Sequence, residues 1–200
     1  IWEDLYNSII IFQTHKFTTD PEVNTKGLEI GTSGKTYNNN IFILNIESEI
    51  EGLRIGGGTT LQNCIFRANI NSDTWAMTVG DGITASNVLF SGCIFNGASG
   101  AINWEGSIPT GFIFKNNVGF VTENSGSATV GDGEWIAHGL SGTPTTVIIT
   151  PRITNYDGVT FIIAVSNRNS THFQVRIQWT NGTALTDDAI PIDWYAEYKP

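Results

Sequence analysis

The sequence has few cysteines, little positive charge and no long apolar run, and each shortage excludes a class of protein. Two cysteines among 200 residues do not make a disulfide framework. No apolar run approaches the roughly 20 residues that a membrane-spanning helix needs, so we expect no membrane insertion. Only 10 basic residues stand against 19 acidic ones, and this excess of negative charge disfavours nucleic acid as a partner.

Motifs of common enzyme chemistry are also missing. The sequence has no His/Cys cluster with metal-ligand spacing, no phosphate-binding loop and no nucleophile motif. We therefore expect neither a bound metal nor a cofactor. A segment with helical periodicity is lacking too, whereas there are 22 glycines and 40% hydrophobic residues. This composition is typical of a globular all-β protein with many turns.

A short apolar pattern repeats along the first part of the chain. The run Gly27–Ile30 recurs at Gly52–Ile55, Ala76–Val79 and Ala101–Trp104, with spacings of 25, 24 and 25 residues. Each copy alternates apolar and other residues, as a strand with one buried face does. The repeat predicts a right-handed parallel β-helix with about 24–25 residues per coil, in which equivalent residues of successive coils stack in columns.

We expect three inward columns of hydrophobic side chains. They are Leu28/Leu53/Met77/Ile102, Ile30/Ile55/Val79/Trp104 and Phe17/Phe42/Phe66/Phe95. A mixed inward column is His15/Asn40/Cys64/Cys93/Asn117, which is expected to be structural. It leaves open whether Cys64 and Cys93 form a disulfide. Because the pattern begins in the middle of a coil, we expect that residue 1 is not the natural start of the polypeptide.

The repeat stops after Phe120, and the composition then changes to a polar, glycine-rich stretch. Short alternating segments follow, with turn signals such as Asp132-Gly133 and Asn181-Gly182 between them. We therefore expect two domains: a parallel β-helix over residues 1–122, and a small antiparallel β-sandwich over residues 123–200.

Residues 115–200 contain the segments "GFVTENSGSATV", "IAHGLSGTPTTVIITP" and "WYAEYKP". In these segments the chain resembles the C-terminal modules of pectate-lyase-superfamily β-helix proteins, as in phage and viral tail spikes and fibres. The resemblance implies a homotrimer, a surface polysaccharide or glycan as partner, and a location outside the cell or on the virion surface.

The superfamily also contains enzymes, so we searched for catalytic residues. A glycosidase needs two carboxyl groups facing each other across a groove. Asp81 and Glu105 are one coil apart after the same strand, which makes them candidates, although solvated corner residues are the simpler interpretation. Glu29 and Arg54 stack on an outward column and are expected to form a cross-strand ion pair.

Other side chains are candidates for binding. Trp75, Trp104 and Trp179 are candidates for stacking on a sugar, with a place in the core as the simpler alternative. Ile41, Ile65, Ile94 and Val118 are expected to form an outward aliphatic column that ends at Lys16. Such a column on a solenoid wall predicts a contact surface between copies of the chain.

Three functions remain open on the sequence. The favoured one is a non-catalytic fibre or spike segment, an adhesin or viral receptor-binding protein that assembles as a trimer and recognises a surface glycan. The second is a fragment of a polysaccharide lyase or glycoside hydrolase. The third is a structural subunit of an extracellular filament or coat.

Overall fold

The computed structural model describes residues 4–14, 27–152, 161–180 and 189–200. The chain divides into two compact units, the first ending at Phe120 and the second running from Val121 to Lys199. The described residues form strands and turns only. Among them, no helix is long and apolar enough to cross a membrane.

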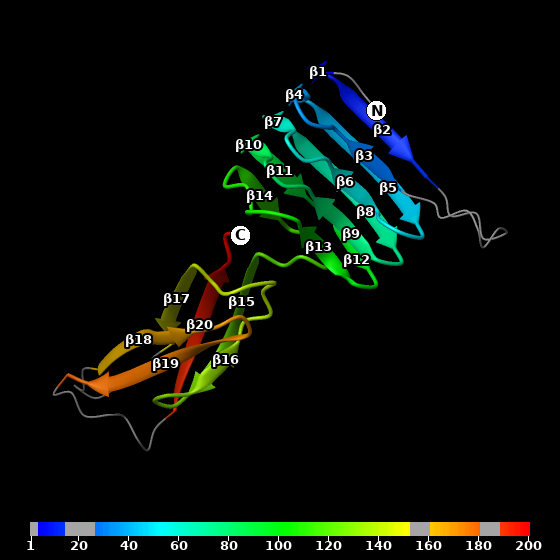
Figure 1. Cartoon of the computed structure of the whole chain (residues 1–200). Helices are drawn as coiled ribbons and strands as arrows, with labels where there is room; N and C mark the ends of the chain where they lie inside the picture. Colours follow the sequence, from blue (N-terminus) through cyan, green and yellow to red (C-terminus); the bar gives the residue numbers. More distant parts are fainter. Residues whose placement is uncertain (1–3, 15–26, 153–160, 181–188) are drawn as a thin grey trace. The chain divides into compact units, whose positions relative to one another are not determined.

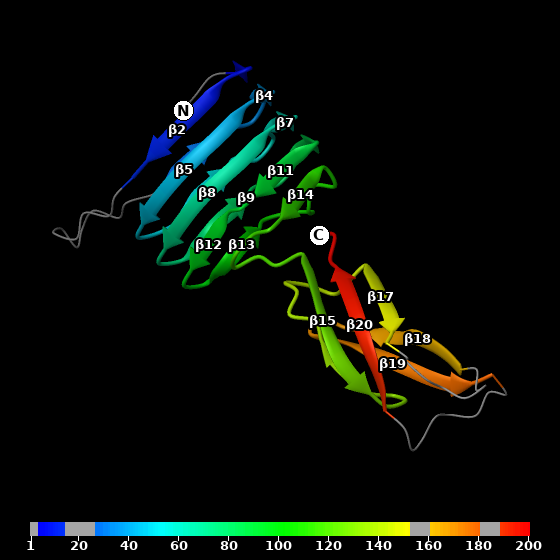
Figure 2. The ribbon, with the colours of Figure 1, turned by 180° about the vertical axis from the view of Figure 1, so that it is seen from behind.

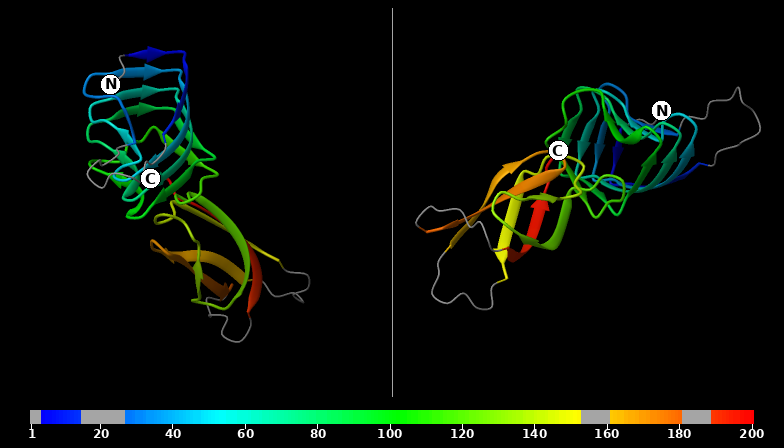
Figure 3. Two further views of the ribbon diagram at one scale, coloured as in Figure 1. Left: turned by 90° about the vertical axis from the view of Figure 1, so that its right-hand side faces the viewer. Right: turned by 90° about the horizontal axis from the view of Figure 1, so that it is seen from below.

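The first unit is a parallel β-solenoid, as the repeat predicted, and three sheets run along it (Figure 1). Sheet A consists of β1 (Leu5–Tyr6), β4 (Thr36–Asn38), β7 (Thr60–Gln62) and β10 (Thr84–Ser86). Sheet B consists of β2 (Ile9–Gln13), β5 (Ile41–Ser48), β8 (Ile65–Ser72), β11 (Val88–Ser91), β12 (Ile94–Gly97) and β14 (Phe112–Lys115). Sheet C consists of β3 (Leu28–Ile30), β6 (Leu53–Ile55), β9 (Trp75–Val79) and β13 (Gly100–Trp104). Figure 3 shows the strands stacked from coil to coil.

The two columns predicted on sheet C are confirmed by the strand register. Leu28 pairs with Leu53, Leu53 with Met77, and Met77 with Ile102. The second column follows two residues later and ends with Trp104 beside Val79. Alternation places these residues inside because successive side chains of a strand point to opposite faces.

The predicted phenylalanine column is correct only in its middle. Phe42 pairs with Phe66, but the next member is Phe90 rather than Phe95, which pairs with Ile70. Phe17 lies outside the described residues. The cause is one extra residue: β11 follows β8 with an offset of 24, whereas β12 follows the second half of β8 with an offset of 25. Gly92, between β11 and β12, has a φ of 65°.

The same extra residue breaks the predicted mixed column. Asn40 and Cys64 lie on adjacent coils, because the Ile65 amide donates to the carbonyl of Asn40. Cys93 lies beside Asn117, whose side-chain oxygen accepts from the Cys93 amide at 2.8 Å. Both cysteines are free and buried. His15 lies outside the described residues.

Asparagine turns the chain once in each coil before sheet B. Five asparagines have a left-handed backbone, with φ between 50° and 57°: Asn7, Asn39, Asn63, Asn87 and Asn116. Asparagine tolerates this conformation better than other residues with a side chain. Stacked side chains also join the coils, since Asn39 Nδ2 donates to Asn7 Oδ1 and Asn87 Nδ2 donates to Asn63 Oδ1, each at 3.0 Å.

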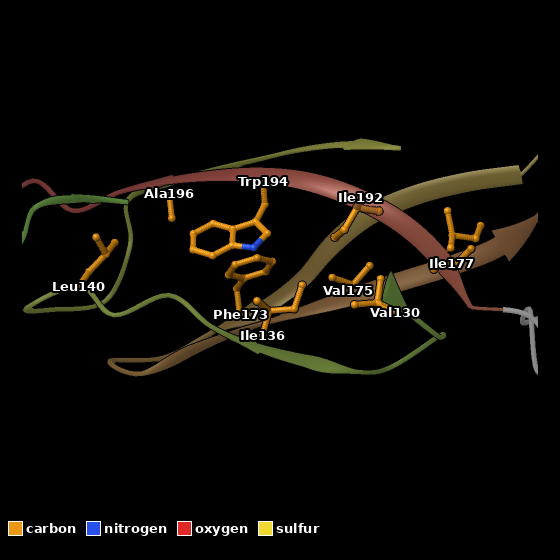
Figure 4. Close-up of a cluster of buried hydrophobic side chains, with 10 residues drawn as sticks. Val130, Ile136, Leu140, Phe173, Val175, Ile177, Ile192, Trp194 and Ala196 are labelled. Atoms are coloured by element: carbon orange, nitrogen blue, oxygen red, sulfur yellow. The ribbon is translucent and has the colours of Figure 1, made fainter. Parts of the chain in front are cut away.

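The second unit has two antiparallel sheets. Sheet D consists of β15 (Glu123–Val130), β20 (Ile190–Glu197) and β17 (Thr146–Pro151). Sheet E consists of β16 (Trp135–Ala137), β19 (His172–Trp179) and β18 (Phe161–Arg168). Their inward residues share one core (Figure 4). Phe173 of sheet E meets Trp194 of sheet D edge to face at 5.5 Å, so the two sheets pack directly.

Candidate functional site

A cleft of about 400 Å³ opens on the outer side of sheet C. Its lining residues come from the beginnings of β3 and β6: Gly27, Leu28, Glu29, Glu51, Gly52 and Arg54. Leu53 and Ile55 are completely buried, so the alternation of β6 directs Arg54 outward to the cleft. The site is therefore built around one guanidinium group on a rigid sheet.

Arg54 binds carboxylates from three places in the sequence. Its Nη1 and Nη2 atoms donate to Glu105 Oε1 and Oε2 at 3.0 and 2.7 Å, which is a two-pronged ion pair. Its Nη1 also donates to Glu51 Oε1 at 3.0 Å. Glu29 Oε1 lies 3.8 Å from Nε, so the predicted ion pair with Glu29 is present but is the longest of the three.

The hydrogen bond to Glu105 is the main reason why the pKa of Arg54 is raised. One positive group faces three negative groups, so the cluster keeps an excess of negative charge. Such a surface favours hydroxyl, amide and cationic groups of a ligand and disfavours carboxylates.

Thr78 lies beneath this cluster. It occupies the position on β9 that pairs with Arg54 on one side and Asn103 on the other. The Arg54–Glu105 ion pair therefore crosses β9. Thr78 is completely buried, and its Oγ1 has no hydrogen-bond partner. A buried hydroxyl without a partner is costly, so the site keeps an unused polar group below its charged surface.

Asp81 and Glu105 lie on adjacent coils, but their carboxylates have different partners. The Glu105 amide donates to the carbonyl of Val79, and Gly106 lies directly against the Asp81 side chain. Glu105 reaches Arg54, whereas Asp81 Oδ1 accepts from the Gly82 amide at 2.8 Å within its own turn. A catalytic role for this pair stays a prediction.

The three tryptophans that the sequence offered as sugar-stacking residues are partly buried. Trp75 lies against Gly100, where even a Cβ atom would collide with its ring. Trp104 packs near Phe112 and Phe114, with ring centroids 6.3 Å from each. Trp179 packs against the core of the second unit. Their sugar-binding role stays a prediction.

Trp135 was missed in the sequence although it is 44% exposed. The signal was available in the segment "EWIAH". Its alternation places Ile136 and His138 inside and therefore turns Trp135 outward. His138 is a buried structural residue, with Nδ1 accepting from the Leu140 amide and Nε2 near the carbonyl of Asn169, both at 3.0 Å.

An aliphatic column does run along the outer face of sheet B (Figure 2), but its membership differs from the prediction. We call it the outer column; its members are Ile9, Ile41, Ile65, Leu89 and Ile113. Ile94 pairs with Asn69 and bridges to Val118, so these two residues lie on the same face in another column. The extra residue between β11 and β12 causes this shift. Lys16 lies outside the described residues.

Within the described ranges, no group of three or more His, Cys, Asp or Glu residues is arranged to hold a metal ion. Both cysteine thiols are buried, and burial raises their pKa, to about 11 for Cys93. These groups therefore offer no ligand set or nucleophile at neutral pH.

The sequence matches no protein-family model, and no curated protein has a significantly similar sequence. Similar solved structures are phage tailspikes. The tailspike protein gp49 of Pseudomonas phage LKA1 is 11% identical, with a TM-score of 0.44 over 83% of this chain and 45% of that one. The gp54 tailspike of Acinetobacter baumannii bacteriophage AP22, solved in complex with capsular saccharide, is 12% identical, with a TM-score of 0.33 over 97% of this chain and 51% of that one.

The chain has the parallel β-helix fold of phage tailspikes. A third similar structure, the tailspike gp61 of Pseudomonas phage phi297, is 15% identical, with a TM-score of 0.31 over 83% of this chain and 37% of that one. The chain spans about half, or less, of the length of these tailspikes.

Proposed function

We propose that this chain is a non-catalytic segment of a virion-surface spike or fibre that assembles as a homotrimer and recognises a surface glycan. The observation that carries the proposal is the outer column of sheet B. Two further isoleucines, Ile11 and Ile43, widen the apolar surface beside Ile9 and Ile41. Ile9 and Ile11 are 68% and 76% exposed, an unusual cost for a solvated wall.

A second copy of the same solenoid suits this surface better than an unrelated partner. Parallel copies have the same rise per coil, so each aliphatic side chain of the column meets an equivalent level of the neighbour. The outer column lies on one face of the chain, and the contact is therefore heterologous. Three such contacts about a threefold axis close into a ring.

The assembly is tested with paired substitutions. Ile65→Asp with Leu89→Asp should yield monomers or insoluble protein, because each buried carboxylate costs several kcal/mol, of order 2–7, in an apolar contact. The matched control is Thr60→Asp with Thr84→Asp, at paired positions on sheet A of the same two coils. The control should keep the mass of the unmodified protein. Equal masses for both variants and the unmodified chain would contradict the assembly surface.

For glycan recognition we propose the Arg54 cleft. Saccharides present many hydroxyl groups, which carboxylates accept from and guanidinium groups donate to. The unpartnered hydroxyl of Thr78 and the excess of negative charge favour a neutral or amino sugar over a uronate. Immobilised capsular and O-antigen polysaccharides provide the probes. Arg54→Ala should weaken binding about tenfold or more, whereas Arg152→Ala in the second unit should not. Equal binding by both variants would contradict this site.

One observation favours the enzyme as a second candidate. Glu51 Oε1 and Glu105 Oε1 each lie 3.0 Å from the same nitrogen, so the two oxygens are within about 6 Å of each other. Glycosidase carboxyl groups are separated by roughly 5–9.5 Å. However, Arg54 occupies the space between them and neutralises both. Release of reducing ends or unsaturated uronates from a polysaccharide, abolished by Glu51→Gln and Glu105→Gln, would establish the enzyme and reject the proposal.

A further inference from the structure

The outer face of sheet E carries a tryptophan on a polar surface. Trp135 of β16 is opposite Gln174 of β19 and remains 44% exposed. Its neighbours Ile136 and Phe173 point into the core. The indole ring therefore lies on the rigid wall of a sheet, supported by strands on one side and open to solvent on the other.

The side chains beside Trp135 are held by hydrogen bonds. Gln174 Nε2 donates to the carbonyl of Gly133 at 2.9 Å, and its Oε1 accepts from Ser166 Oγ at 3.1 Å. Arg176, two residues along the same face, pairs through Nε with Asp132 Oδ1 at 3.2 Å. An amide, a hydroxyl and a neutralised guanidinium group are thus fixed in place next to one aromatic ring.

This arrangement differs from a surface suited to a protein partner. The outer column of sheet B is continuous and aliphatic, whereas Trp135 is one apolar ring beside His172, Gln174 and Arg176. The apolar face of a hexose stacks on such a ring, and its hydroxyl groups point sideways to planar donors and acceptors. Because Asp132 neutralises Arg176, the surface is suited to a neutral sugar.

We propose that Trp135, Gln174 and Arg176 form a binding site for a neutral hexose or N-acetylhexosamine on the second unit. Trp135 is the platform, Gln174 the oriented hydrogen-bonding group and Arg176 a donor at its side. This inference rests on glycan recognition as the proposed function, but it concerns a different surface from the Arg54 cleft and is tested separately.

The experiment uses the full chain and three defined probes: chitotriose, maltotriose and lactose at millimolar concentration. At least one should bind by calorimetry and shift the tryptophan emission. Trp135→Ala should weaken that binding about tenfold or more, Trp135→Phe should retain a measurable part, and Gln174→Ala should weaken it severalfold. The matched control is Ile162→Ala, which removes another exposed side chain, opposite Gln178 on the same sheet.

The proposal is overturned if no probe binds the unmodified chain, or if Trp135→Ala binds as the control does. A change in molecular mass on Trp135→Ala, without a change in sugar binding, would make the surface an interface instead. Arg54→Ala separates the two proposals, because it should weaken polysaccharide binding at the first site and leave Trp135-dependent binding unchanged.

Discussion

Phe66 stacks on Phe90 with ring centroids 4.6 Å apart and planes 13° apart. Phe42 stacks on the other side of Phe66 at 4.5 Å, so the ring is enclosed by equivalent rings of the adjacent coils. Phe66→Ala leaves a cavity in a fully buried stack, and we expect the free energy of unfolding to fall by roughly 3–5 kcal/mol. Chemical denaturation measures it.

Arg67→Ala is the control for this prediction. Arg67 follows Phe66 in β8 but faces solvent, so its removal should change the free energy of unfolding by less than about 0.5 kcal/mol. If both variants unfold at the denaturant concentration of the unmodified protein, the assignment of Phe66 to the core is wrong.

Asn63 tests the asparagine turns. Its φ of 50° disfavours residues with a Cβ atom, and its Oδ1 accepts from Asn87 Nδ2. Asn63→Ala should lower the free energy of unfolding by about 1–2 kcal/mol, and Asn63→Gly by less, because glycine keeps the backbone conformation and loses only the side-chain bond. Thermal unfolding compares the two. A glycine variant less stable than the alanine variant would contradict the backbone argument.

Cys93 provides the pH prediction. Burial raises the pKa of its thiol from 9.0 to about 11 in the folded state, so the folded protein holds a proton that the unfolded chain releases. This contribution to stability is complete below about pH 9 and is lost as the pH rises towards 11. Cys93→Ala should flatten the decline in unfolding free energy over that interval. An unchanged decline would contradict the burial.

The same burial predicts thiol reactivity. At pH 8 an aromatic disulfide reagent should leave Cys64 and Cys93 unmodified in the folded protein and should modify both in denaturant, because thiolate is the reactive form. Rapid modification of the folded chain would contradict it, and so would the absence of free thiols after unfolding.

Arg54 tests the electrostatics of the cleft. Arg54→Ala leaves Glu29, Glu51 and Glu105 without their shared partner, and the free energy of unfolding should fall by roughly 1–2 kcal/mol at low salt and by less at high salt. The control is Arg152→Ala, which removes an ion pair with Asp193 whose side chains are both about half exposed, at a cost below about 1 kcal/mol. Equal losses for both variants would show that the cluster has no special strength.

Periodicity was sufficient for the sheets whose coils have constant length. Leu28, Leu53 and Met77 recur at 25 and 24 residues, and their column was predicted correctly. The offset between Ile10 and Phe42 is instead 32 residues, so a period of 25 could not place the first coil. In "VLFSGCIF" both Phe90 and Phe95 face inward, and only the register decides which one continues the column.

The cleft was less predictable than the sheets. Stacking of Glu29 on Arg54 follows from the repeat, and their ion pair was expected. The shorter contact joins Arg54 to Glu105, two coils away, because the long arginine side chain reaches across Thr78. Column arithmetic describes where Cα atoms stack but not how far flexible side chains extend. Trp135 was missed for another reason, since short strands of an antiparallel module have no repeat to check their parity.

The central claim is that the outer column is an interface between copies of this chain. The most direct test is the molecular mass of the unmodified protein at micromolar concentration, measured by multi-angle light scattering after size exclusion. The account predicts three times the 21.8 kDa of one chain. An open polymer would indicate that the same contact fails to close and would favour the filament subunit instead. A mass of 21.8 kDa would contradict the claim.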